Sequence, residues 1–336
     1  MIENPILNSP FEEPTQHFEV VGGRFTEKVV SGRRASSYLT PVAQPKGRRG
    51  LQLLMPGQDT AVKPNEFINE IRSHVRIWRE AGYPGVTAVS QSLLEYWRAP
   101  ERPSRLFFAQ IEAVETAIYI TEFAPKNRQH IINMLDAMNL EQNDRLPRRA
   151  VKMATGTGKT VVMGMLIAWQ TLNKVAYPQD KRFSDAFLIM TPGVTIRDRL
   201  RVLRPEEPPG INYYAQRDLV PPDLRDRLLD ARIVITNFHS FLLRDTLEAA
   251  KLNKQILGGR IEETPAAMVR RVVRDLGGRK NVIVFNDEAH HCYMALEPDA
   301  ESGDEAKAAR VWLDGLRAVR DAVGVRAVFD LSATPF

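Results

Sequence analysis

The sequence predicts an α/β protein whose mostly parallel β-sheet is covered by helices on both faces. From about residue 146 onward, short apolar segments alternate with longer segments of helical periodicity, an order typical of parallel strands joined by helices. A glycine-rich turn at Met153–Thr160 follows one such strand and opens one such helix. Ligands of these sheets bind at the carboxyl ends of the strands, so we expect the chemistry at that edge.

The predicted sheet occupies the domain that we place at residues 146–336. Its expected strands are Ala150–Met153, Phe187–Met190, Arg232–Thr236, Val282–Phe285 and Arg326–Leu331. Its expected helices are Lys159–Thr171, Thr195–Leu203, Ala266–Leu276 and Ala306–Val323.

Two regions precede this domain. Residues 1–62 are rich in Pro, Gly and Arg, and we expect an irregular arm with short strand-like pieces at Glu27–Val30 and Ser37–Val42. Residues 63–145 carry apolar residues three and four apart, which predicts a helical region. Its expected helices are Pro64–Gly82, Val89–Trp97, Phe107–Phe123 and Gln129–Met138.

The composition limits the possible classes of function but does not identify one. The chain has 336 residues, a formal charge of +5 and a pI near 9.3, which permits nucleic-acid binding but does not require it. Cys292 is the single cysteine, so no internal disulfide can form and a reducing compartment fits. The first twelve residues are not a secretory signal, and the longest apolar run, Val161–Trp169, is too short to span a bilayer. We therefore expect a cytoplasmic protein without membrane association.

The turn M-A-T-G-T-G-K-T has the residues of a phosphate-binding loop. Gly156 and Gly158 allow backbone N–H groups to turn toward phosphate oxygens at the positive end of the following helix. Lys159 would reach the β- and γ-phosphates of ATP, and the Thr160 hydroxyl would bind Mg²⁺. Met153 stands where the general pattern has glycine, but the variant A-x-x-G-x-G-K-T fits fully. A glycine-rich turn without a ligand is the alternative.

A second polar group follows the apolar run V-I-V-F-N. Asp287 would hold Mg²⁺ together with Thr160, Glu288 would orient and deprotonate water, and His290 would couple the site to its neighbours. Two alternatives are a solvated acidic turn and a metal site at His290, His291 and Cys292. A zinc site usually takes ligands from separated pairs, and no second cysteine exists to complete one.

Several stretches together resemble the DEAH-box branch of superfamily 2 helicases and translocases. Within it they are most similar to the restriction subunits of type III restriction–modification enzymes. The resemblance rests on L-F-F-A-Q-I-E-A-V-E-T (106–116), K-M-A-T-G-T-G-K-T (152–160), L-I-M-T-P-G (188–193), I-V-I-T-N-F-H-S-F (233–241), N-D-E-A-H-H-C (286–292) and L-S-A-T-P-F (331–336), and less specifically on N-S-P-F-E-E-P (8–14). It implies that residues 146–336 form the first RecA-like lobe of a P-loop ATPase motor.

The resemblance also implies site roles. Gln110 would read the adenine edge, with Phe107 or Phe108 against its face; the catalytic residues would be Lys159, Asp287, Glu288 and His290. ATP would lie on Ala154, Thr155, Gly156, Thr157, Gly158, Lys159 and Thr160. Nucleic-acid contact, or its coupling to hydrolysis, would fall to Thr191, Pro192, Gly193, Thr236, Asn237, Ser332 and Thr334. Ordinary strand-to-loop turns explain Thr191–Gly193 and Thr236–Asn237 equally well.

The implied function is an ATP- and Mg²⁺-dependent motor acting on double-stranded DNA, with a methyltransferase subunit as a possible partner. An RNA-remodelling ATPase and a non-hydrolysing nucleotide-binding scaffold are the alternatives. No second strand–helix series follows Lys159, so we expect an N-terminal fragment. Without the arginine of a second lobe its turnover would fall by on the order of 10³ or more. P-D-A-E-S-G-D-E-A-K (298–307) matches a nuclease pattern in letters, but we interpret it as a loop because no strand separates its acids.

The basic clusters at residues 197–204 and 268–275 fit a DNA-facing stripe or a solvated helix face.

Overall fold

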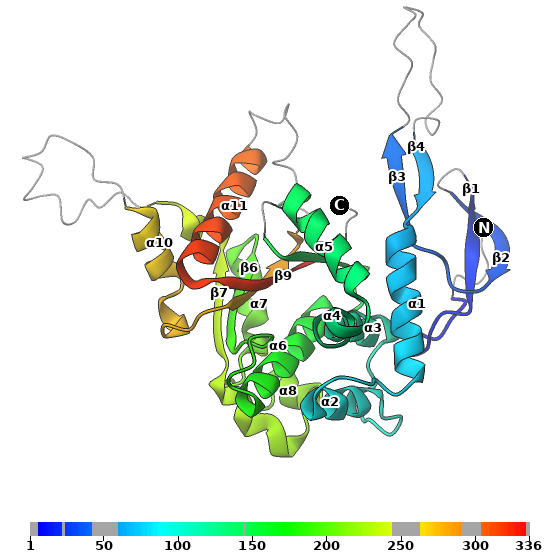
Figure 1. Ribbon diagram of the computed structural model, residues 1–336, viewed down its shortest axis with the longest axis horizontal. Coiled ribbons are helices and arrows are strands. Elements are labelled where there is room, and N and C mark those ends of the chain that lie inside the picture. The colour runs from blue at the N-terminus through cyan, green and yellow to red at the C-terminus, as the bar shows by residue number, and fades with distance from the viewer. Residues whose placement is uncertain are drawn as a thin grey trace, which may run out of the picture.

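Five parallel strands form the central sheet of the protein (Figure 1). The computed structural model describes residues 6–21, 24–41, 60–143, 146–243, 263–289 and 304–333. The strand order is β5–β9–β8–β6–β7, and every neighbouring pair is parallel. The strands are β5 (Arg148–Lys152), β6 (Ala186–Thr191), β7 (Arg232–Asn237), β8 (Val282–Asp287) and β9 (Val325–Ser332). This confirms the α/β class and the RecA-like architecture predicted from the sequence.

Both faces of the sheet are buried. Side chains alternate between faces along a strand, so Phe187 and Ile189 pack with helix α6 (Lys159–Ala176), while Leu188 packs on the opposite side. Helices α10 (Pro265–Val272) and α11 (Asp304–Val323) cover that opposite side. Burial on both faces explains why these strands are almost continuously apolar.

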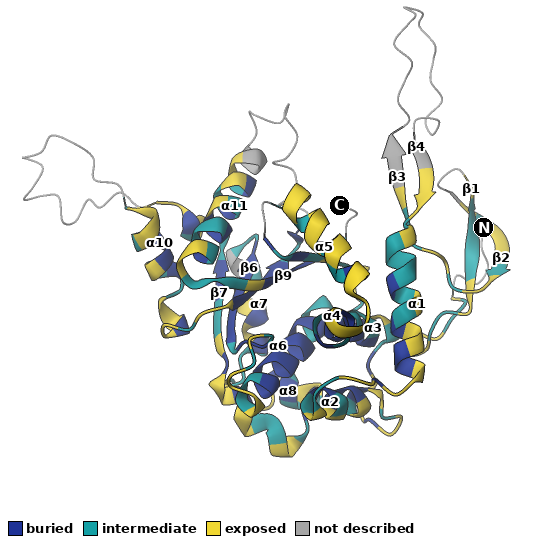
Figure 2. Cartoon of the chain, in the orientation of Figure 1, coloured by how far each residue is buried: buried dark blue, intermediate teal, exposed yellow. Residues whose placement is uncertain are grey.

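Helix α6 is enclosed on its other side by the N-terminal helices (Figure 2). Helices α2 (Ala88–Arg98) and α3 (Phe108–Ile118) contact α6 directly, and α1 (Glu66–Glu80) packs on α3. Every residue of α6 from 162 to 173 is buried, which suits a helix that is apolar on all sides. One continuous core therefore joins the helical region to the sheet.

The predicted helix Phe107–Phe123 is interrupted. After α3 the chain forms a π-helical turn, η1 (Tyr119–Phe123), then the short α4 (Ala124–Asn127) and finally α5 (Gln129–Gln142). The carboxylate of Glu122, in this turn, is 1% exposed. It accepts hydrogen bonds from the Thr87 amide at 2.8 Å, the Ser90 hydroxyl and the Trp169 indole at 2.9 Å. Glu122 thus ties α2 and α6 together.

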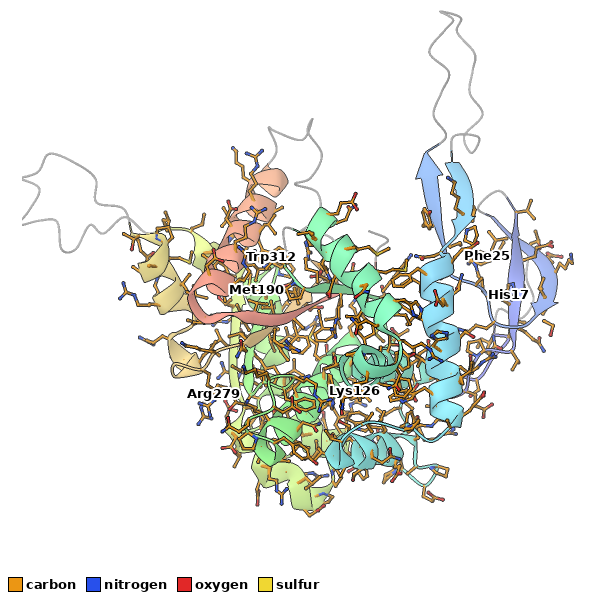
Figure 3. All side chains as sticks on the ribbon, in the orientation of Figure 1. His17, Phe25, Lys126, Met190, Arg279 and Trp312 are labelled. Atoms are coloured by element: carbon orange, nitrogen blue, oxygen red, sulfur yellow. The ribbon has the colours of Figure 1, made fainter. Side chains whose placement is uncertain are left out.

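Two antiparallel hairpins stand where an irregular arm was expected. They are β1 (Gln16–Val21) with β2 (Arg24–Ser31), and β3 (Ser37–Pro41) with β4 (Thr60–Pro64). Figure 3 labels His17 and Phe25 on the first hairpin, where the Phe25 side chain is 66% exposed. The β3–β4 ladder joins segments about twenty residues apart in the sequence, a distance at which local patterns do not indicate pairing.

The remaining connections are short helical turns. Two predicted helices end early: α7 (Val194–Arg199) and α10 each pass into a 3₁₀ turn, η2 (Leu200–Leu203) and η5 (Arg274–Leu276). Between β6 and β8 the chain also forms α8 (Tyr213–Gln216), η3 (Pro222–Asp230) and η4 (Phe238–Phe241). Within the described parts of the chain, no helix combines the length and the apolar character needed to cross a membrane.

Substitution Glu122→Ala tests the tie between the helical region and α6. It removes the acceptor of the half-buried Thr87 amide and of the buried Ser90 hydroxyl and leaves the Trp169 indole with only its bond to Ser90, so we expect a loss of about 2–4 kcal/mol in the free energy of unfolding. Urea denaturation followed by tryptophan fluorescence measures this loss. Glu80→Ala, at an exposed position, is the control and should change stability by less than about 0.5 kcal/mol. Equal stability of the two variants would contradict the assignment.

Candidate nucleotide-binding site

The glycine-rich loop turns sharply between β5 and α6. Gly156 has φ 81° and Gly158 has φ 85° with ψ 45°, left-handed conformations that glycine adopts without strain. Gly158 is the N-cap of α6, and Thr157 donates from Oγ1 to the Ala154 carbonyl at 2.6 Å. The loop thus presents the first N–H groups of an 18-residue helix, where an anion is stabilised by unpaired donors and the helix dipole.

Gln110 lies against this loop and is only 5% exposed. Its Oε1 accepts from the Phe107 amide at 2.9 Å, and its Nε2 donates to the Thr157 carbonyl at 2.9 Å. A Cβ atom built on Gly158 would lie 2.2 Å from Gln110 Nε2. Gln110 therefore supports the loop from the α3 side, a role that the sequence did not indicate. The adenine contact of Gln110 stays a prediction.

The two aromatic candidates for the adenine face differ in their surroundings. Phe108 lies between two guanidinium groups, with Arg33 at 5.4 Å and Arg79 at 5.1 Å from the ring centroid. Phe107 is half-buried, and its ring centroid lies 5.5 Å from that of Phe11. Both rings are half-buried, and the adenine contact of either stays a prediction.

The acidic strand end meets the loop lysine. Glu288 directly follows β8, and its Oε1 lies 3.1 Å from Lys159 Nζ, with side-chain exposures of 31% and 12%. Glu288 has φ 53°, a left-handed conformation that is strained for a residue with a side chain and occurs often at functional sites. Residues about 130 positions apart are thus in contact at one edge of the sheet.

Asp287 lies beside this pair in a poorly solvated position. Burial raises the pKa of the Asp287 carboxyl to about 6; the neighbouring Glu288 charge adds to the rise in pKa, and Lys159 opposes it. Removal from water and a like charge both disfavour ionisation. An added cation would relieve the cost of keeping both carboxylates ionised, so this edge is electrostatically suited to a metal.

These residues fit a magnesium nucleotide. The loop offers backbone donors and Lys159 for phosphates, Thr160 follows Lys159 in the first turn of α6, and Asp287 supplies a carboxylate. Mg²⁺ in such sites needs only one or two protein ligands, since phosphates and water complete its shell. Among the described residues no group of three His, Cys, Asp or Glu side chains forms a metal cage. His290, His291 and Cys292 lie outside the described residues.

The predicted nucleic-acid residues also lie at strand ends, where their hydroxyls bond internally. Thr191 and Asn237 are paired in register at the ends of β6 and β7. Thr191 Oγ1 donates to the Gly193 carbonyl at 2.9 Å, and Thr236 Oγ1 donates to Ser240 Oγ at 2.7 Å. Pro192 joins Thr191 to Gly193. Nucleic-acid contact by this group stays a prediction.

On β9, Ser332 is fully buried, and its carbonyl accepts from the Met153 amide at 3.0 Å. The end of β9 therefore adjoins the start of the phosphate loop. Thr334 and most of residues 298–307, the stretch with the nuclease letters, lie outside the described residues.

The arginines of the basic cluster at residues 268–275 lie in different surroundings. Arg271 pairs with Glu263 at 2.7 Å and donates to the Ser240 carbonyl at 2.9 Å. Arg270 and Arg274 are exposed. Arg271 thus holds the 3₁₀ turn after β7 in place, and a DNA-facing stripe is left as a hypothesis for the exposed two.

The parallel sheet and its glycine-rich loop define a P-loop α/β protein of the helicase-like class. A model of the family described as type III restriction enzyme, res subunit, matches residues 105–336. Because the match covers more than half of the 336 residues, the chain belongs to the type III restriction enzyme res-subunit family. Searches of curated proteins and of solved structures give no match.

Substitution Gly158→Ala tests the packing of Gln110 against the loop. The added Cβ meets Gln110 and forces a left-handed alanine, so we expect both a lower melting temperature and loss of magnesium-nucleotide binding. Gly156→Ala is the matched control for stability, because its Cβ would meet nothing within 4 Å; it should cost only about 1–2 kcal/mol for the left-handed conformation. The double variant Gly158→Ala/Gln110→Ala should recover part of the stability. Equal melting temperatures for the two glycine variants would contradict this packing.

Substitution Asp287→Asn tests the electrostatic cost at the metal edge. A folded-state pKa of about 6 lies above the ordinary value of 3.8, so the folded protein holds this proton longer than the unfolded chain. The parent should therefore lose stability as pH rises from about 4 to about 6, and the loss should persist at pH 7. We expect the variant to be about 1–2 kcal/mol more stable at pH 7, with no gain at pH 4. Urea denaturation at both pH values measures this, with the exposed Asp226→Asn as control.

Proposed function

We propose that this chain supplies the ATP-binding motor lobe of a DNA translocase or helicase in a type III restriction enzyme. The observation that carries the proposal is the 3.1 Å contact between Lys159 and Glu288 at the edge that also holds the glycine-rich loop. A scaffold that only binds nucleotide needs no carboxylate there. The proposal assigns phosphate binding to residues 154–160 and the acidic chemistry to Asp287 and Glu288.

The contact also suggests an order of events. Without nucleotide, Lys159 and Glu288 neutralise each other. Lys159 binds the phosphates when ATP enters, and Glu288 is then released to orient and deprotonate water. Thr160 and Asp287 would hold Mg²⁺, which would supply positive charge beside the phosphates. Each step uses residues of the loop or of the β8 end.

The proposed nucleic-acid partner is duplex DNA. Family membership supports DNA as substrate, and the net charge of +5 favours a polyanion. Thr191, Pro192, Gly193, Thr236, Asn237, Ser332 and Thr334 are the proposed contact or coupling residues. A methyltransferase subunit is the proposed protein partner.

Substitutions Lys159→Ala and Glu288→Gln separate binding from hydrolysis. Because Glu288→Gln frees Lys159, we expect it to bind Mg-ATP at least as tightly as the parent and to reduce single-turnover hydrolysis by about 10² or more. Lys159→Ala should lose most of the nucleotide affinity. Calorimetry measures binding, and single-turnover assays with excess protein measure hydrolysis, each with duplex DNA, single-stranded DNA, RNA and no nucleic acid.

Full turnover by Glu288→Gln would overturn the assignment of the base. Stimulation by RNA alone would favour an RNA-remodelling ATPase.

A further inference from the structure

Three buried polar side chains connect the strands that carry the nucleotide site. Asn286 on β8 and Asp330 on β9 are 0% exposed, and Arg148 on β5 is 7% exposed. Arg148 Nε lies 2.8 Å from Asp330 Oδ2, and Asn286 Nδ2 donates to Asp330 Oδ1. Side chains of three neighbouring strands thus meet in the interior of an otherwise apolar sheet.

This network lies one residue below the functional edge. In the β8–β9 ladder Asn286 pairs with Asp330, and Asp287 pairs with Leu331 directly above them. In the β5–β9 ladder Asp330 pairs with Ala150, two residues before the strand ends. The three strands are therefore connected at one level, just before their ends reach the loop and the acids.

The network lies on the face away from α6. Alternation along β8 puts Asn286 on the face of Val284, which packs in the same core as Met190 of β6 and Trp312 of α11 (Figure 3). Asp287 consequently faces the α6 side, where Lys159 lies. The network can shift the position of Asp287 only through the backbone of β8.

The backbone ladder between β8 and β9 is irregular. Its register shifts between Val282 and Ile283, at the start of β8. The register of a strand decides which side chains reach which face. A side-chain hydrogen bond at Asn286 fixes the register at the far end, which is the end that presents Asp287.

Asn286 has an unfavourable feature for a purely structural residue. Its Oδ1 atom is buried and has no hydrogen-bond partner among the residues that the structure describes. An unpaired buried acceptor lowers stability, and an apolar side chain of similar size would avoid it. What asparagine provides that leucine does not is the bond to Asp330.

We propose that Asn286 and Asp330, held by Arg148, form a cross-strand clamp that fixes the end of β8 and so positions Asp287 for magnesium nucleotide. Asn286 and Asp330 are positioning residues, since they act through the backbone of β8. The inference rests on the proposed function for its effect on nucleotide binding, and the register of β8 can be tested without nucleotide.

Substitution Asn286→Leu tests the clamp in the whole 336-residue chain. We expect a melting temperature within a few degrees of the parent, because removal of the unpaired oxygen offsets the loss of the donor to Asp330. We also expect about ten-fold weaker binding of Mg-ADP, little change in the weaker binding of ADP measured in EDTA, and faster amide hydrogen exchange in the peptide containing the β8 end. Met190→Leu is the matched control, since Met190 pairs in register with Asn286. The substitution conserves side-chain volume and lies on the same face of the sheet.

A second variant guards against a folding defect. Asn286→Leu/Arg148→Met/Asp330→Leu replaces the whole network by apolar groups, a change that is often tolerated where loss of a single partner is not. It should fold and show the same loss of Mg-dependent affinity. If either variant folds and binds Mg-ADP within two-fold of the parent, the proposal is overturned. If the parent itself binds no Mg-nucleotide, the proposed function fails, and unchanged hydrogen exchange in Asn286→Leu then overturns the clamp.

Discussion

The 3.1 Å contact between Lys159 and Glu288 depends on one constraint, the parallel register of three strands. β9 lies between β5 and β8 and is hydrogen-bonded to both. Because all three strands run in the same direction, their carboxyl ends reach the same edge, and the loop after β5 faces the acids after β8. If β9 were antiparallel, β5 and β8 would still end at one edge only if the registers of both strands with β9 matched. A shift of β8 by one residue would turn Asp287 to the other face of the sheet.

The loop itself needs support from outside the sheet. Glycine turns have low intrinsic rigidity, and here α3 supplies the missing constraint through Gln110, which accepts from the Phe107 amide and donates to the Thr157 carbonyl of the loop. α3 is in turn fixed by its continuation into the π-helical turn, whose Glu122 bonds to α6 at Trp169. The helix that follows the phosphate loop and the residue that braces the loop therefore belong to the same packed unit. The glycine-rich loop and the packing of the helical region are physically connected through α3.

The sequence predicts what local pattern determines. Apolar runs gave all five sheet strands within a few residues, and the spacing of Gly156, Gly158 and Lys159 gave the loop. It did not predict contacts that depend on distant partners. The β3–β4 pairing, the donors around Glu122 and the bond of Asn286 to Asp330 join residues 19 to 47 positions apart, and no periodicity marks them. Gln110 was singled out for a ligand, and its bond to Thr157 became visible only once α3 and the loop were placed side by side.

Three consecutive residues at the end of β8 each have a feature that lowers the stability of the fold, compared with an ordinary strand end. Asn286 has a buried oxygen without a partner in the described part of the chain, burial raises the pKa of the Asp287 carboxyl, and Glu288 has a left-handed backbone. Any one of these occurs in proteins for local reasons, but their succession on one strand has a common cause if the strand end is built for a ligand. A bound cation would directly lower the electrostatic cost of ionising Asp287. The neighbouring residues, Asn286 and Glu288, then hold the carboxylates where that cation can reach them. The chain folds without ligand despite these unfavourable features, because the apolar sheet beneath is buried on both faces and stabilises the edge.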